Sequence, residues 1–274
     1  MSISDNSEGI QILPLTENIV DDVICCPGGL EVKNQDMKGD IYETVLWRKR
    51  LLNKGLSGYI FYKGETPHGF IEYIPAESSP FPIKAPGSAV LMCFHWASTE
   101  EEPHLETEKE MIEMVIEDIY DNFDGLVAFG WENPEHFPIE MLEELGFESI
   151  ESEKLTKLMW LPLKDGASRP YILDMGIDVE DRSDDGKLNI VSTYSHRCPY
   201  SIHNGEKVKE VIQEIDDDRI DFTQHSIDTH EDALEWADDP GNWEYLMING
   251  EEVDIFFKSS DEIREIIEEK LSEL

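Results

Sequence analysis

The chain has 274 residues, a length at which we expect about two domains. Apolar residues make up 40% of it, enough for a buried core, and this excludes wholesale disorder. Asp and Glu number 61 against 22 Lys and Arg, so the formal net charge is −39. A surface this acidic excludes general affinity for nucleic acid or anionic membranes, which bind through clustered cations.

The acidic residues are spread over the whole chain rather than gathered in a tail. This favours a surface adapted to a salt-rich environment over an acidic mimic of nucleic acid, which would concentrate its charge on one face. No apolar run approaches the roughly 20 residues of a membrane span. The first residues lack the basic and apolar regions of a signal peptide, so we expect a cytoplasmic protein.

The four cysteines are an adjacent pair, Cys25 and Cys26, and two single residues, Cys93 and Cys198. Their spacing matches neither a zinc site nor a disulfide framework. We therefore expect free thiols and no metal centre.

The first block predicts strands and helices in a mixed α/β order. Alternating residues predict a hairpin over 58–63 and 69–74, followed by a proline-rich crossing, 75–86, and a buried strand over 88–96. Thr107 and Glu110 form a predicted capping box for a helix whose apolar stripe includes Ile112, Val115, Ile119 and Tyr120. A strand over 125–129, a helix over 139–145 and a strand over 155–163 complete the block.

Residues 165–186 follow as a predicted linker between domains at 1–164 and 187–274. Most of the linker, including 178–186, offers little for a core, although Tyr171 and the two residues after it could pair with one domain. The last block predicts strands and helices in the order βαβαββα. Their predicted ranges are 188–194, 202–215, 220–227, 231–237, 243–248, 253–257 and 261–274, with an Asn249-Gly250 hairpin turn.

The run from Gly69 to Pro75, the run Met92-Cys-Phe-His-Trp96 and Gly146-Phe147 after a short helix resemble the GNAT family of N-acetyltransferases. The two-block layout resembles the YoaP-type subgroup, in which a GNAT-like domain precedes a smaller thioredoxin-like domain. The resemblance implies a mixed-sheet α/β acyltransferase fold in which the strand over 88–96 splays from its neighbour and pairs with the pantetheine arm of acetyl-CoA.

The resemblance also implies an acyl transfer to a small-molecule or protein amine. Glu72 and His95 are the candidate bases, and Tyr73 and Cys93 are the candidate acids. Each has a structural alternative: a hydrogen-bonded strand residue for His95, a small core residue for Cys93, and an exposed hairpin position for Glu72.

Cofactor contacts are expected at Phe94, Trp96, His104, Leu105 and Asn133, with Trp131 and His136 near the acceptor. The family's phosphate loop corresponds to residues 97–109, which contain no glycine and are rich in glutamate. This loop places negative charge where the phosphates of acetyl-CoA would bind.

In the second block, Cys198-Pro-Tyr-Ser201 between a strand and a helix is similar to the single-thiol motif of glutaredoxins. A cysteine at a helix N-terminus beside His196 and Arg197 would be stabilised as a thiolate. The sequence therefore leaves open an acyltransferase, a thiol-redox or thiol-binding protein that uses Cys198, and a binding module without chemistry.

Overall fold

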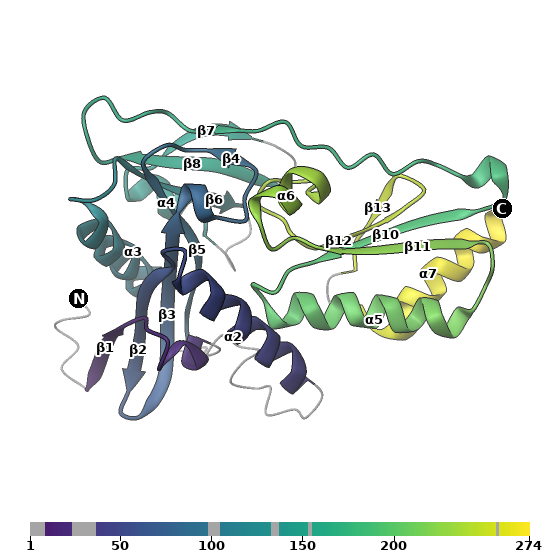
Figure 1. Cartoon of the computed structure of the whole chain (residues 1–274), viewed down its shortest axis with the longest axis horizontal. Coiled ribbons are helices and arrows are strands. Elements are labelled where there is room, and N and C mark those ends of the chain that lie inside the picture. Colours follow the sequence, from purple (N-terminus) through teal and green to yellow (C-terminus); the bar gives the residue numbers. More distant parts are fainter. Residues whose placement is uncertain (1–8, 24–36, 98–104, 133–136, 153–154, 256–257) are drawn as a thin grey trace.

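A computed structural model describes the chain except for residues 1–8, 24–36, 98–104, 133–136, 153–154 and 256–257. It has mixed α/β architecture, with a seven-stranded sheet in the N-terminal part (residues 9–164) and a four-stranded sheet in the C-terminal part (residues 187–274) (Figure 1). Within the described residues, no helix combines the length and the apolar character needed to cross a membrane.

The larger sheet has the strand order β1-β2-β3-β5-β6-β8-β7. Its strands are β1 (Ile10–Pro14), β2 (Ser57–Lys63), β3 (Thr66–Pro75), β5 (Ser88–Trp96), β6 (Gly125–Trp131), β7 (Glu148–Ser152) and β8 (Thr156–Pro162). Strands β5 and β6 are parallel, and every other neighbouring pair is antiparallel. The predicted hairpin and the predicted buried strand over 88–96 are confirmed.

Apolar layers cover both faces of this sheet. On one face lie α2 (Lys38–Leu52), through Trp47 and Leu51, and the crossing 76–86, through Phe81 and Ile83. On the other face lie α3 (Leu105–Ile119) and α4 (Ile139–Glu144). Among the described residues, short 3-10 helices span Val20–Val23, Ala76–Ser78 and Ser183–Asp185.

The predicted start of α3 is wrong. The helix begins at Leu105, so Thr107 lies inside its first turn rather than at its cap. Threonine is tolerated there, and Glu106 and Glu108 in that turn interact favourably with the helix dipole. The stripe is shifted as well, because Met111, Ile112, Val115 and Ile119 are buried whereas Tyr120 is 55% exposed.

The C-terminal part confirms the predicted order βαβαββα. Its elements are β10 (Leu188–Tyr194), α5 (Pro199–Ile215), β11 (Ile220–Ser226), α6 (His230–Trp236), β12 (Tyr245–Ile248), β13 (Glu251–Val253) and α7 (Ser260–Glu273). The sheet order is β11-β10-β12-β13, with β10 and β11 parallel. Helices α5 and α7 pack on one face of the sheet and α6 packs on the other.

Local signals explain most boundaries in this part. Thr229 and Ser259 form capping boxes that begin α6 and α7. Asn249 and Gly250 both have positive φ, as the tight turn between β12 and β13 requires. Helix α5 begins at Pro199, earlier than predicted, because proline at the first helical position needs no hydrogen-bond partner for its nitrogen.

Residues 165–186 pack against both parts of the molecule. The short strand β9 (Tyr171–Ile172) pairs with β4 (Ile83–Lys84) of the N-terminal part, as the sequence suggested. Val179, however, is buried against the C-terminal sheet with Met175 and Ile177 packed beside it, so the expectation that 178–186 offers little for a core is wrong at Val179. Met175, Ile177 and Val179 do alternate with Gly176 and Asp178, but the run is too short to identify a buried segment without the neighbouring sheet.

Polar contacts join the two parts directly. The Asp239 carboxylate accepts hydrogen bonds from the backbone N–H groups of Leu155 (2.7 Å) and Thr156 (3.1 Å) and from the Thr156 hydroxyl (2.5 Å). The His230 ring lies 2.7 Å from the Phe81 carbonyl oxygen. These contacts place α6 and the loop after it beside the larger sheet (Figure 1).

Candidate functional site

The parallel pair β5 and β6 separates after three residues. Ser88, Ala89 and Val90 pair with residues 125–127 of β6, and beyond Val90 no described strand pairs with this edge of β5. Strand β6 continues alongside β8 instead. The splay that the sequence resemblance implies is therefore present, and it leaves one backbone edge of residues 91–96 without a described neighbouring strand.

A β-bulge at Met92 lies where the strands part. Tyr73 of β3 pairs with Leu91 and Glu72 pairs with Cys93, which leaves Met92 as an extra residue. The bulge shifts the alternation of side chains, so Leu91 packs on the α3 face whereas Met92 and Cys93 both pack on the α2 face. Strict alternation along the strand would place Leu91 and Cys93 on the same face, and the sequence contains no sign of the bulge that separates them.

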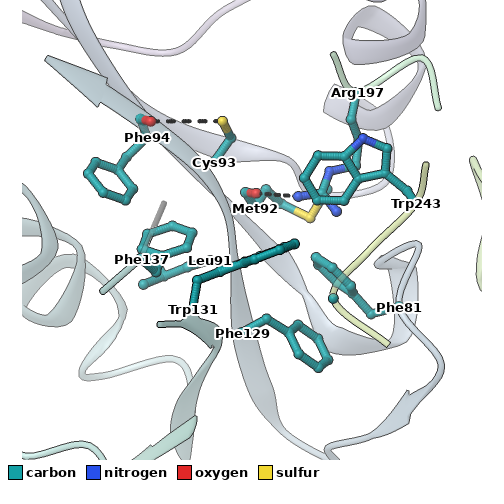
Figure 2. A pocket seen from close by; sticks show the side chains of 11 residues that line it. Phe81, Leu91, Met92, Cys93, Phe94, Phe129, Trp131, Phe137, Arg197 and Trp243 are labelled. Carbon is teal, nitrogen blue, oxygen red and sulfur yellow. Dashed lines mark hydrogen bonds between the residues drawn. The ribbon is translucent and has the colours of Figure 1, made fainter. Parts of the chain in front are cut away.

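A cavity of about 20 Å³ lies in the gap between the separated strands (Figure 2). This volume suffices for about one water-sized group. Strand β5 contributes residues 91–94 to its lining and β6 contributes Phe129 and Trp131, and Phe81 and Phe137 add further aromatic surface. The C-terminal part closes the cavity with Arg197, Gly241 and Trp243.

Arg197 is the charged side chain at this cavity. Its guanidinium carbon lies 3.8 Å from the centre of the Trp243 ring and 4.6 Å from that of the Phe81 ring. One nitrogen, Nη2, donates a 2.6 Å hydrogen bond to the carbonyl of the bulged Met92 (Figure 2). Burial lowers the pKa of Arg197 to about 10, so the side chain keeps its charge at neutral pH.

Glu72 forms a buried ion pair with Arg48 of α2. Arg48 Nε lies 2.8 Å from Glu72 Oε2 and Arg48 Nη2 lies 3.0 Å from Glu72 Oε1, and the Glu72 side chain is fully buried. The same Arg48 nitrogen also donates to the backbone carbonyl of Arg197. The exposed hairpin position considered for Glu72 is therefore wrong, and both of its oxygens are engaged by a cation.

Tyr73 lies on the opposite face of β3, and its hydroxyl donates to the Asp118 carboxylate of α3. Burial, together with the hydrogen bond to Asp118, raises the pKa of Tyr73. A phenol with a raised pKa gives up its proton less readily, so this geometry does not favour Tyr73 as an acid.

Cys93 is half-buried and lines the cavity. His95 is half-buried, lies two residues further along β5 and pairs with Phe70 of β3. Of the two expected cofactor contacts on this strand, Phe94 lines the cavity beside Phe137, whereas Trp96 packs against the Phe61 and His68 rings. The structure thus brings Cys93 and Phe94 to one site and leaves Trp96 outside its lining.

Other expected site residues lie outside the described part of the chain. They are His104, Asn133 and His136. Leu105 is the first residue of α3.

Cys198 caps the N-terminus of the 17-residue helix α5 and is half-buried. Ser201, at the position of a second cysteine in a CxxC motif, is buried and accepts a hydrogen bond from the Ser195 backbone. His196 lies 2.5 Å from Asp228. Burial raises the pKa of Asp228, but its hydrogen bonds with the His196 ring and backbone outweigh this and hold the pKa below the usual value.

Sequence reasoning did not identify Arg197, Phe81 or Trp243 as parts of the cavity. Arg197 was considered only as a positive charge near Cys198. No periodic or spacing signal could show that residues more than 100 positions apart from β5 close its gap, because that depends on how the two parts pack.

No protein-family model matches the chain, and no curated protein matches it significantly. Solved structures that match include the ribosomal-protein-S5-alanine acetyltransferase from Vibrio fischeri, at 11% identity and a TM-score of 0.43 over 58% of this chain and 96% of that one. An acetyltransferase from Thermus thermophilus matches at 12% identity and a TM-score of 0.40 over 56% of this chain and 97% of that one.

A PaiA N-acetyltransferase from Thermoplasma acidophilum, solved in complex with coenzyme A, matches at 10% identity and a TM-score of 0.39. The alignment covers 56% of this chain and 99% of that one. At such low identity, no residue role is transferred from these proteins.

Proposed function

We propose that the chain is an acyltransferase of the GNAT type that moves an acyl group from acetyl-CoA or a related thioester to an amine. The observation that carries the proposal is the separation of β5 from β6 after Val90 and Val127. It leaves a backbone edge available beside a cavity lined by Cys93 and Phe94. The C-terminal part, whose order βαβαββα and parallel β10–β11 pair suit a thioredoxin-like fold, supplies the cavity's outer wall.

The described residues fit the acyl end of such a thioester. The edge of β5 over 91–96 offers backbone donors and acceptors in an extended conformation, and the cavity beside it accepts a small head group. The buried Nε of Arg197 has no hydrogen-bond partner among the described residues, and it belongs to a side chain that lines this cavity. A buried donor left without a partner costs free energy, which a bound acceptor atom would recover.

The charge at the N-terminus of α3 is lower than its sequence suggests. Burial raises the pKa of Glu108, in the first turn, to about 7, so this carboxyl is partly neutral at neutral pH. Glu106 in the same turn pairs with Lys109. Both effects weaken the repulsion of a phosphate-bearing ligand at this helix end.

Bound acetyl-CoA would supply the acyl group as an activated thioester. The β5 edge would orient it, and the aromatic rings of Phe94, Phe129 and Trp131 would exclude water from the reacting atoms. Cys93 holds a thiol proton at the cavity and is the residue that we expect to protonate the leaving thiolate. We keep His95 as the proposed base because it lies two positions further along the same strand.

Calorimetric titration with acetyl-CoA in about 0.1 M and about 2 M potassium chloride tests the proposal. High salt screens the repulsion between the acidic surface and the phosphates, so we expect tighter binding there and a higher melting temperature. Absence of binding at both salt concentrations would refute the proposed function.

Two cysteine variants separate acyl transfer from thiol chemistry at Cys198. We expect Cys93→Ala to lower kcat for acetyl transfer by about 10²-fold, the lower end of the range for a lost general acid. Cys198→Ala is the matched control and should leave kcat within about twofold. The reverse dependence would favour the thiol-based alternative.

A further inference from the structure

The guanidinium of Arg197 packs against two aromatic rings at the wall of the cavity. Its carbon lies 3.8 Å from the centre of the Trp243 ring and 4.6 Å from that of the Phe81 ring, and the Met92 carbonyl accepts a hydrogen bond from one nitrogen. The side chain is 7% exposed, yet its Nε has no partner among the residues that the structure describes. The side chain that lines the cavity therefore carries a buried N–H group without a hydrogen-bond partner, while its Nη2 is held by the Met92 carbonyl (Figure 2).

The buried charges around this side chain do not balance. Arg48 and Glu72 neutralise each other in a two-point ion pair. No Asp or Glu in the described part of the chain forms an ion pair with Arg197, so one positive charge remains. Burying a charge without an ion-pair partner costs free energy. The chain has 61 acidic residues, yet none of those described forms an ion pair with Arg197.

The cavity limits what the missing anion can be. Its volume of about 20 Å³ accepts a group close to the size of one water molecule, which is the size of one oxygen of the anion rather than of the whole anion. A carboxylate is planar, small and matched to the N–H groups of an arginine edge, whereas a phosphate is bulkier and tetrahedral. Aromatic rings line much of the remaining wall, so they offer few competing partners to the anion.

We propose that Arg197 and the cavity between β5 and β6 form a carboxylate-binding subsite, completed by the C-terminal part of the chain. Given the proposed acyl transfer, on which this assignment to a substrate rests, the carboxylate belongs either to an amino-acid-like acceptor or to the acyl group of the donor. The subsite then selects substrates that carry a carboxylate over neutral analogues of the same size.

Acetate, the smallest stable carboxylate with a methyl group, is the first probe, and acetamide is its neutral counterpart. With chloride used to match ionic strength, acetate should raise the melting temperature of the wild-type chain in a saturable way, by about 2 °C or more. Acetamide should not. The shift should vanish in Arg197→Met and remain in Arg219→Met, a matched control whose arginine is paired with Asp217 on the surface. A shift that survives in Arg197→Met, or no acetate-specific shift in the wild type, overturns the proposal.

A second variant decides the matter if Arg197→Met does not fold. Cys93→Asp introduces a carboxylate into the cavity wall near the guanidinium. If the site requires an anion, this variant should melt at a higher temperature than the wild type without any probe, and acetate should no longer add to it. A lower melting temperature, or an undiminished acetate effect, contradicts the proposal.

Two further pairs of probes locate the carboxylate. If the wild type prefers glycine to glycinamide as acceptor and Arg197→Met does not, the carboxylate belongs to the acceptor. If the wild type prefers malonyl-CoA to acetyl-CoA and Arg197→Met does not, the carboxylate belongs to the donor. If Arg197 affects discrimination in neither of the two pairs, the proposed role of the subsite in transfer is overturned. The acetate experiment needs no CoA, so acetate binding without acetyl-CoA binding refutes the proposed function alone, and the converse refutes the subsite alone.

Discussion

Glu72 shows how a residue with the chemistry of a catalytic base serves a different purpose in the structure. Its carboxylate holds Arg48 on α2, and Arg48 in turn holds the backbone of Arg197. The pair therefore joins β3, α2 and the start of the C-terminal motif within one buried network. A base in this position would have to break a two-point ion pair each time it accepted a proton.

We predict that Glu72→Gln destabilises the protein by about 3–5 kcal/mol, because Arg48 is left as a buried charge without a partner. The free energy of unfolding in urea measures this. The double variant Arg48→Met/Glu72→Gln should recover part of the loss, since it removes the stranded charge. A Glu72→Gln protein of unchanged stability but without transferase activity would instead establish Glu72 as the base.

Glu108 makes stability depend on pH. Its pKa rises from 4.5 to about 7 because burial penalises the charged form. The folded state thus binds this proton more tightly than the unfolded state, and the stabilisation present below pH 4.5 is lost as the pH rises through 7. The loss is at most about 3 kcal/mol.

We therefore predict that Glu108→Gln unfolds at the same urea concentration as the wild type near pH 4.5 and at a higher concentration at pH 8. Glu106→Gln, on the exposed side of the same turn, is the control for charge alone. Equal effects of both substitutions at pH 8 would show that the general acidity of the helix end, not burial of Glu108, is responsible.

At the scale of elements, the sequence predicts regular segments well and their irregularities poorly. Strand β5 matches its predicted range because a run of apolar residues between turn signals identifies a buried strand. The bulge at Met92 leaves no trace in that run, although it decides which residues face the cavity. The capping pattern at Thr107 predicts a start for α3 that is three residues too late, because the structure does not use this pattern.

Within the candidate site, the sequence identified the strand and three cavity residues, which are Cys93 and Phe94 on β5 and Trp131 on β6. Arg197 and Trp243 enter the site only through packing between the two parts, which no local pattern encodes. Val179 is a similar case, since its burial depends on the neighbouring sheet and not on its own segment.

Gly69 of β3 sets how closely β5 approaches at its splayed end. A Cβ at this position would lie 2.7 Å from the Trp96 ring and 2.9 Å from the His95 carbonyl oxygen. We predict that Gly69→Ala displaces the end of β5, costs about 1–3 kcal/mol of stability and weakens acetyl-CoA binding.

Calorimetric titration and urea unfolding measure these two effects of Gly69→Ala. Gly39→Ala in α2, where no atom lies within 4 Å of the added Cβ, is the control and should be neutral or slightly stabilising. Tight binding and full stability in Gly69→Ala would show that β5 tolerates the shift.

For the whole molecule, the contact between Asp239 and residues 155–156 is the clearest polar link between the two parts. The carboxylate accepts hydrogen bonds from Leu155, Thr156 and its own neighbour Gly241, whose nitrogen lies 2.9 Å away. Gly241 packs so closely on Thr156 that a Cβ would lie 2.6 Å from its methyl group.

Asp239→Asn places an amide where only acceptors fit, so we predict a loss of about 1–3 kcal/mol. Because the loss falls on the contact between the parts, calorimetric melting should broaden or split into two transitions, and proteolysis within 165–186 should become faster. Asp238→Asn, the adjacent acidic residue, is the control. A single sharp transition with unchanged proteolysis would show that apolar packing alone joins the two parts.

The reach of Arg197 to the Met92 carbonyl has a consequence for biosynthesis. The last strand of the large sheet is complete once Pro162 leaves the ribosome. The wall of the cavity is complete only after Trp243 has been synthesised as well. At ordinary translation speeds that interval lasts roughly 4–16 s. During this interval the aromatic residues of β5 and β6 at the cavity are not yet covered by Trp243. A chaperone or a ligand that binds too early would find the cavity most accessible at this stage.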